Sequence, residues 1–80
     1  MYYVYLMKSI NNPEKSYVGY TIDLAARLQK HNEGGSRYTK DHRPWKLVSF
    51  IAFEEQDKAF MFEKYLKSHA GRDFAKKRLW

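Results

Sequence analysis

The sequence predicts an α+β fold: a small three-stranded antiparallel sheet, formed by an N-terminal hairpin and a third strand, flanked by three helices. Two runs of aromatic and branched residues are separated by a turn signal within the first twenty positions, and two later segments repeat apolar residues at helical spacing. A chain of 80 residues is the size of one domain, here residues 1–80, and buries only about 60% of its unfolded surface. The core must therefore be small and rich in large aromatic rings.

The hairpin is predicted from residues 2–8 and 16–20, with Asn11-Asn12-Pro13 as the turn between them. Successive side chains of a strand point to opposite faces. If odd residues pair with odd residues, Tyr5 and Tyr17 lie on the same side of the sheet within diagonal reach. The sequence alone leaves that register open.

The first helix is predicted over residues 22–33. Thr21 is a suitable N-cap, Asp23 suits the positive end of the helix dipole, and Gly34-Gly35 ends the helix. At 100° per residue, Leu24, Leu28 and His31 lie along one stripe of the helix. Arg27 lies at the edge of this stripe. We therefore expect Arg27 and His31 to be neighbours next to the core.

Residues 36–44 have glycine, serine and proline boundaries and no periodicity, which predicts a mobile basic loop. Residues 45–53 are predicted to form the third strand. Their apolar side chains stand at both odd and even positions, so we expect this strand to be buried on much of both faces.

The second helix is predicted to begin at a cap on Asp57 and to reach about His69. Its apolar stripe consists of Ala59, Phe62, Leu66 and Ala70. Gly71 is expected to interrupt it, and a basic third helix follows over residues 72–79.

Fifteen Lys and Arg against nine Asp and Glu give a formal charge of +6, which favours a polyanionic partner. A basic surface without such a partner is the alternative that composition leaves open. The absence of cysteine excludes disulfides and thiolate zinc sites. No apolar run approaches the roughly 20 residues of a membrane span, and no secretion signal is evident, so we expect a cytoplasmic location and no membrane partner.

Five elements occur in a recognisable order: Tyr3-Val4-Tyr5, Tyr17-Val18-Gly19 after eleven further residues, Arg27, His31 and Glu63. Over nearly the whole chain this pattern resembles the GIY-YIG nuclease family, in particular small single-domain bacterial members related to the nuclease domain of the excision-repair endonuclease. The chain departs from the family pattern at Tyr3, where the motif has glycine. It also lacks the asparagine that follows the glutamate in some members, since Ala75 and its neighbours offer no amide.

The resemblance implies a metal-dependent endonuclease that hydrolyses DNA phosphodiester bonds in DNA repair or processing. It implies that Tyr5 and Tyr17 are the motif tyrosines, Arg27 the active-site arginine and Glu63 the metal ligand. One carboxylate suits a divalent ion, Mg²⁺ or Mn²⁺, that keeps several waters. The alternatives are ion pairs on the helix surface, between Glu63 and Lys67 and between Arg27 and Asp23, each one turn apart.

The general base remains open among Tyr5, Tyr17 and His31. A phenol with a pKa near 10 is a poor base at neutral pH, whereas a histidine starts near 6.5, so acid–base chemistry favours His31. The family resemblance favours a tyrosine instead.

Basic residues are expected to bind the DNA backbone without reading sequence. Together with the motif glycine Gly19, the nucleic-acid-binding set is Lys30, Arg37, Lys40, Arg43, Lys67, Arg72, Lys76 and Lys77. No base-reading module is recognisable, so selection should depend on shape, such as a branch, flap or nick. Two other functions fit the same residues: a non-catalytic nucleic-acid-binding module, and a nuclease subunit that needs a partner protein.

Overall fold

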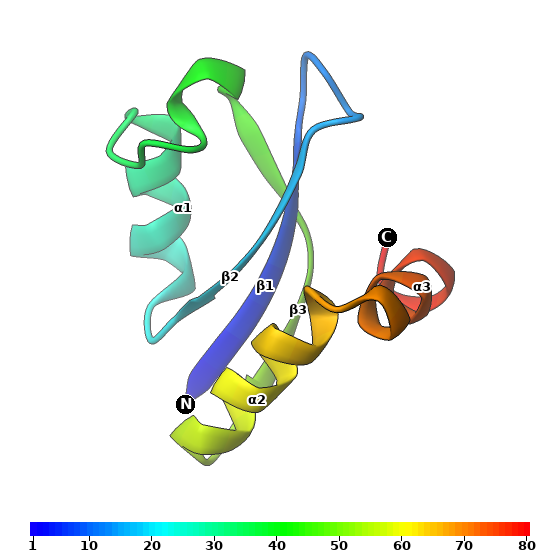
Figure 1. Cartoon of the computed structure of the whole chain (residues 1–80). Coiled ribbons are helices and arrows are strands. Elements are labelled where there is room, and N and C mark those ends of the chain that lie inside the picture. The colour runs from blue at the N-terminus through cyan, green and yellow to red at the C-terminus, as the bar shows by residue number, and fades with distance from the viewer.

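The computed structural model describes residues 1–80 and contains one sheet and three α-helices. In chain order the elements are β1 (Tyr2–Ser9), β2 (Ser16–Thr21), α1 (Leu24–Asn32), the short 3-10 helix η1 (Lys40–His42), β3 (Trp45–Phe53), α2 (Gln56–Leu66) and α3 (His69–Arg78). The strands are ordered β2-β1-β3, and both pairs are antiparallel. The predicted α+β architecture is therefore confirmed (Figure 1). None of the helices has the length and hydropathy of a membrane span.

The hairpin register pairs odd residues with odd residues. Tyr5 lies opposite Gly19 and Met7 opposite Tyr17, so the two motif tyrosines share one side of the sheet at a diagonal. Their ring centroids are 6.2 Å apart. On the other side of β1, the register with β3 shifts between Leu6 and Met7.

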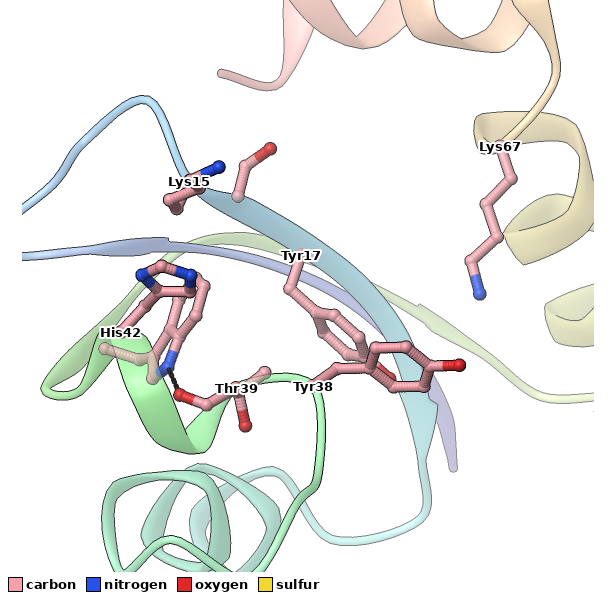
Figure 2. Close-up of a pocket in the computed structure, with 8 residues that line it drawn as sticks. Lys15, Tyr17, Tyr38, Thr39, His42 and Lys67 are labelled. Carbon is pink, nitrogen blue, oxygen red and sulfur yellow. Dashed lines mark hydrogen bonds between the residues drawn. The ribbon is translucent and has the colours of Figure 1, made fainter.

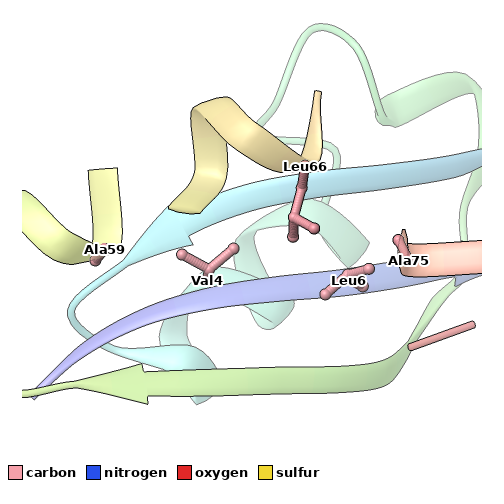
Figure 3. Packing of buried hydrophobic residues seen from close by; sticks show 5 residues of the cluster. All are labelled: Val4, Leu6, Ala59, Leu66 and Ala75. Atoms are coloured by element: carbon pink, nitrogen blue, oxygen red, sulfur yellow. The ribbon is translucent and has the colours of Figure 1, made fainter. Parts of the chain in front are cut away.

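Alternate residues of β1 separate two cores. Val4 and Leu6 pack against the α2 and α3 side, in a cluster that also contains Ala59, Leu66 and Ala75 (Figure 3). Tyr5 and Met7 point to the opposite face, where they pack with Trp45 and with half-buried residues of α1 and β2. The molecule therefore has three layers, with α1 on one face of the sheet and α2 with α3 on the other (Figure 1).

Helix α1 begins two residues later than predicted. Its N-cap is Asp23, whose carboxylate accepts a hydrogen bond from the Ala26 amide at 3.1 Å. The Thr21 hydroxyl instead accepts from the Asp23 amide and donates to the Asp23 carbonyl. The predicted cap at Thr21 is wrong because this hydroxyl closes a local turn that holds Asp23 in the capping position.

Helix α2 is shorter than predicted. Glu55 occupies its N-cap without a side-chain hydrogen bond, and Asp57 lies in the first turn rather than at the cap. The helix ends at Leu66, so Ala70 belongs to α3 and is exposed rather than part of the apolar stripe of α2.

Gly71 lies inside α3 and does not interrupt a helix. The Ser68 hydroxyl caps α3 by accepting from the Gly71 amide. A Cβ at position 71 would overlap the Tyr65 carbonyl and come within 2.7 Å of the Leu66 Cα. The glycine is therefore required for the close approach of α3 to the end of α2.

Strand β3 is less buried than predicted. Trp45 is buried, but Lys46, Phe50 and Ala52 are exposed and the other residues of the strand are partly buried. The reason is its position at the edge of the sheet, where β1 is its only neighbouring strand.

Candidate active site

Tyr5 stands at the centre of the candidate site because β1 is the central strand. Its side chain is buried, and its ring lies over Gly19 on β2. A Cβ at position 19 would overlap the Tyr5 hydroxyl and come within 2.9 Å of the Tyr17 ring. The absence of a side chain at Gly19 therefore leaves room for the Tyr5 phenol. Gly19 is itself buried, and its contact with nucleic acid stays a prediction.

A buried chain of hydrogen bonds begins at the Tyr5 phenol. The Tyr5 hydroxyl is 2.8 Å from His31 Nε2, and His31 Nδ1 is 2.7 Å from the Thr39 hydroxyl. His31 and Thr39 are each only 1% exposed. Both ring nitrogens of His31 are thus occupied, and neither is free to contact water or substrate. His31 therefore contacts its surroundings through two hydroxyl groups, those of Tyr5 and Thr39.

The electrostatic surroundings keep both groups neutral near pH 7. Burial, followed by the nearby Tyr17 phenol, raises the pKa of Tyr5, and Glu63 adds to this, while Arg27 acts in the opposite direction. Burial, with the positive charges of Arg27 and Lys30, lowers the pKa of His31. A protonated phenol therefore faces an unprotonated imidazole across the 2.8 Å contact.

Tyr17 and Arg27 lie close to this pair. The Tyr17 ring is partly buried, with its centroid 5.2 Å from that of His31. Arg27 is partly buried on α1 and influences the pKa of both Tyr5 and His31. It forms no ion pair with Asp23, whose carboxylate caps α1 instead.

Glu63 comes to the site from α2. Its side chain is 24% exposed, and its Oε2 lies 3.2 Å from Lys67 Nζ. The ion pair considered from the sequence is therefore present, and the same carboxylate is one of the smaller causes that raise the pKa of Tyr5. Glu63 therefore takes part in an ion pair on the helix surface and also affects the candidate site.

The structure gathers no group of three or more His, Cys, Asp or Glu side chains that could hold a metal ion. A hydrated Mg²⁺ needs only one or two protein carboxylates when substrate phosphate supplies further oxygens. Glu63 fits that requirement, because its Oε1 takes no part in the pair with Lys67 and its side chain is accessible.

The eight basic residues expected at the DNA backbone are all exposed, and four of them line three hollows. Lys67 lines a hollow of about 510 Å³, here called the Tyr38 hollow, with Lys15, Ser16, Tyr17, Tyr38, Thr39, His42 and Trp45 (Figure 2). Lys67 and Arg72 line a second one of about 360 Å³, here called the Arg72 hollow, with Ser16, Tyr17, Val18, Leu66, Ala75 and Trp80. Lys40 and Arg43 line a separate polar hollow.

Three residues of this region were not predicted from the sequence. Thr39, Tyr38 and Lys15 lie in segments without periodicity. Thr39 reaches His31 because the loop folds back over α1, where Trp45 Nε1 also donates to the Thr39 carbonyl at 2.8 Å. Such contacts depend on the path of the loop in space.

The GIY-YIG catalytic domain model matches residues 1–78. The chain is 39% identical over 67 residues to a UPF0213 protein of Pediococcus pentosaceus, covering 82% of this chain and 68% of the relative. It is 41% identical over 69 residues to the structure-specific endonuclease subunit SLX1 of Kluyveromyces lactis, covering 78% of this chain and 24% of that protein. The chain belongs to the GIY-YIG family.

A solved relative supports the same fold. The solution structure of a UPF0213 protein from Bacillus halodurans is similar with a TM-score of 0.56 and 31% sequence identity, covering 96% of this chain and 84% of that chain. Family membership and the endonuclease relatives support nuclease activity for this chain.

Proposed function

We propose that this protein is a metal-dependent endonuclease that hydrolyses DNA phosphodiester bonds and selects branched, flap or nicked DNA with little sequence preference. The observation that carries the proposal is the buried chain from the Tyr5 phenol through His31 to Thr39, which lies beside the Tyr17 ring. Support comes also from the family and from relatives named as structure-specific endonuclease subunits.

Tyr5 is the group that exchanges a proton with the attacking water in this proposal. A phenol with a raised pKa does not ionise freely, but it can pass its own proton to His31 Nε2 while accepting one from water. The water oxygen then forms the new bond to phosphorus, and the bond to the leaving oxygen breaks. Thr39 fixes the imidazole ring in the orientation that receives the Tyr5 proton.

Arg27 and Tyr17 have supporting roles. The Arg27 guanidinium, held beside Tyr5 and His31, is suited to stabilise negative charge on the phosphoryl oxygens in the transition state. The Tyr17 ring lies beside Tyr5 and His31, and its hydroxyl orients the water or the phosphate.

Glu63 is the proposed metal ligand, through the carboxylate oxygen outside its pair with Lys67. A divalent ion held there, Mg²⁺ or Mn²⁺, supplies charge stabilisation and leaving-group assistance. The chain's part is to present one carboxylate of α2 and to keep Lys67, an exposed cation, as its partner before substrate binds.

The test is a nicking assay on duplex, flap, branched and single-stranded DNA, with Mg²⁺ or Mn²⁺. We expect Glu63→Gln to abolish cleavage while folding and DNA binding persist, because the carboxylate holds the metal and not the nucleic acid. Glu55→Gln is the matched control, since Glu55 also pairs with a lysine on α2, at 3.9 Å, but on an exposed part of the surface. Equal activity of both variants would contradict the metal-ligand role.

A second candidate is a nuclease subunit that acts only with a partner protein. It is favoured by the names of the endonuclease relatives and by exposed apolar residues on α2 and α3, namely Phe60, Met61, Tyr65 and Phe74. Folded protein that binds flap DNA but cuts none of the substrates would support this candidate over an enzyme that is active alone.

A further inference from the structure

We propose that the Tyr38 hollow and the Arg72 hollow form one groove that holds an unpaired strand of DNA, with the Tyr38 ring as a stacking surface for a base. The inference rests on the proposed function, since it names the part of a flap or branched substrate that this side of the site receives. It assigns a specificity role to Tyr38 and a backbone-binding role to Arg72.

The two hollows adjoin each other at the site, because they share three lining residues. Both are lined by Ser16, Tyr17 and Lys67. Tyr17 is the outer tyrosine of the site, and Lys67 is the partner of Glu63. A strand lying along the groove would therefore pass beside the scissile phosphate, with Tyr38 on one side of Tyr17 and Arg72 on the other.

Tyr38 is the most exposed large apolar side chain of the molecule, at 82%. A ring with so little buried surface contributes little to folding. It nevertheless lies against a hollow, with its hydroxyl directed toward the side on which Lys67 extends from α2 (Figure 2). The ring face is thus available for a ligand beside the candidate site.

The chemistry of the groove suits a single strand. Aromatic residues, Tyr38, Tyr17 and Trp80, are interspersed with the cations Lys15, Lys67 and Arg72, and no acidic residue lines either hollow. Grooves that bind single strands combine positive charge along the backbone with aromatic rings for the bases. In a duplex the faces of the bases are covered by their neighbours, so Tyr38 should favour unpaired DNA.

Binding can be measured without cleavage by fluorescence anisotropy in EDTA. The probes are a fluorescein-labelled oligothymidine of about 12 nucleotides, within the site size of such grooves, and a duplex of the same length. We expect Tyr38→Ala to weaken single-strand binding by about 10-fold, a loss in the range for one base–aromatic stack, and to leave duplex binding unchanged. Tyr38→Phe should bind as wild type, because it keeps the ring, and Tyr38→Leu should resemble Tyr38→Ala.

Two controls come from the hollow on another part of α2, which Lys58 and Tyr65 line. Tyr65→Ala removes an exposed tyrosine, and Lys58→Ala removes one positive charge, without touching the groove. Arg72→Ala should lower the salt dependence of single-strand binding by about 0.7 in the log–log slope, the value for one phosphate contact, and Lys58→Ala should not.

Equal weakening of single-strand and duplex binding in Tyr38→Ala, or wild-type binding in that variant, would overturn the inference. The outcome is independent of the nuclease proposal, because no metal is present in the assay. A protein that binds single strands through Tyr38 but never cleaves would contradict the proposed function alone. A protein that cleaves flaps with the same preference over nicked duplex in wild type and Tyr38→Ala would contradict this inference alone.

Discussion

The two faces of the sheet bury different kinds of side chain, although the same strand supplies the centre of both. On the α2 and α3 face the buried cluster is entirely apolar and includes Val4 and Leu6. On the α1 face, Tyr5 leads into the buried polar pair His31 and Thr39. Alternation along β1 thus separates an apolar cluster that stabilises the fold from the polar chain that is proposed to carry the proton, while the proposed metal ligand Glu63 comes from α2.

Polar groups can be buried on the α1 face because they satisfy one another. No buried side-chain nitrogen or oxygen in the structure lacks a hydrogen-bond partner. An unpartnered buried hydroxyl or imidazole would cost about 1–3 kcal/mol, a large share of the stability of so small a domain. The chain from Tyr5 to Thr39 is therefore a structural unit as well as a candidate catalytic one.

The largest effect is expected from truncating Leu6 or Met7, which are adjacent and fully buried on β1. Leu6→Ala and Met7→Ala each remove a side chain with 0% exposure, and each should lower the free energy of unfolding by about 2–5 kcal/mol. Urea unfolding measures this, with Trp45 reporting on one face and Trp80 on the other. Cleavage by the folded fraction should fall more in Met7→Ala, because Met7 packs with Tyr5.

If Leu6→Ala lowers cleavage as much as Met7→Ala at equal folded fraction, the proposed difference between the two faces is contradicted. Assays at low temperature with an osmolyte such as sucrose keep both variants folded.

The second effect concerns the phenol hydroxyls. Tyr5→Phe and Tyr17→Phe should each lower the cleavage rate by at least about 10²-fold, as expected for proton-transfer or orienting groups, because the ring and its packing remain. Tyr20→Phe is the matched control on the other face, where the Tyr20 hydroxyl accepts from Gln56. Single-turnover cleavage measures the rates. Near wild-type rates for both Tyr5→Phe and Tyr17→Phe would remove the phenols from the mechanism.

The face of a strand or helix on which a residue lies was predicted better from the sequence than the residues at which the elements begin and end. Alternation and helical spacing are local properties, so the position of His31 on the α1 stripe followed from them. The glycines needed knowledge of the assembled molecule, because Gly71 is explained by the Tyr65 carbonyl of another helix and Gly19 by the Tyr5 ring of another strand. Thr39 was missed for the same reason, since its contact depends on the path of a loop.

The third effect is expected at Thr39. Thr39→Val keeps the shape of the side chain but leaves His31 Nδ1 without its 2.7 Å partner, so the imidazole loses its fixed orientation. Cleavage should fall by about 10-fold, less than the roughly 10²-fold or more expected for the proton-transfer group itself, and its pH profile should shift. Ser49→Ala removes a comparable hydroxyl, bonded to the Leu79 carbonyl at 3.0 Å, and should change stability alone. A pH profile that matches wild type would assign Thr39 a purely structural role.

The smallest effect is a pH dependence of stability from His31. Burial and the charges of Arg27 and Lys30 lower its pKa in the folded protein, whereas in the unfolded chain it titrates near 6.5. Below about pH 6.5 the unfolded state therefore binds the proton first, and the free energy of unfolding falls as the pH is lowered toward the folded pKa. Urea unfolding between about pH 5 and 7, above the range of most carboxyl groups, should show this loss in wild type and a weaker one in His31→Gln. His69→Gln, at an exposed position on α3, is the control and should keep the wild-type slope. If wild type and His31→Gln lose stability equally, protonation of His31 does not destabilise the α1 face. The acid sensitivity then arises elsewhere in the chain.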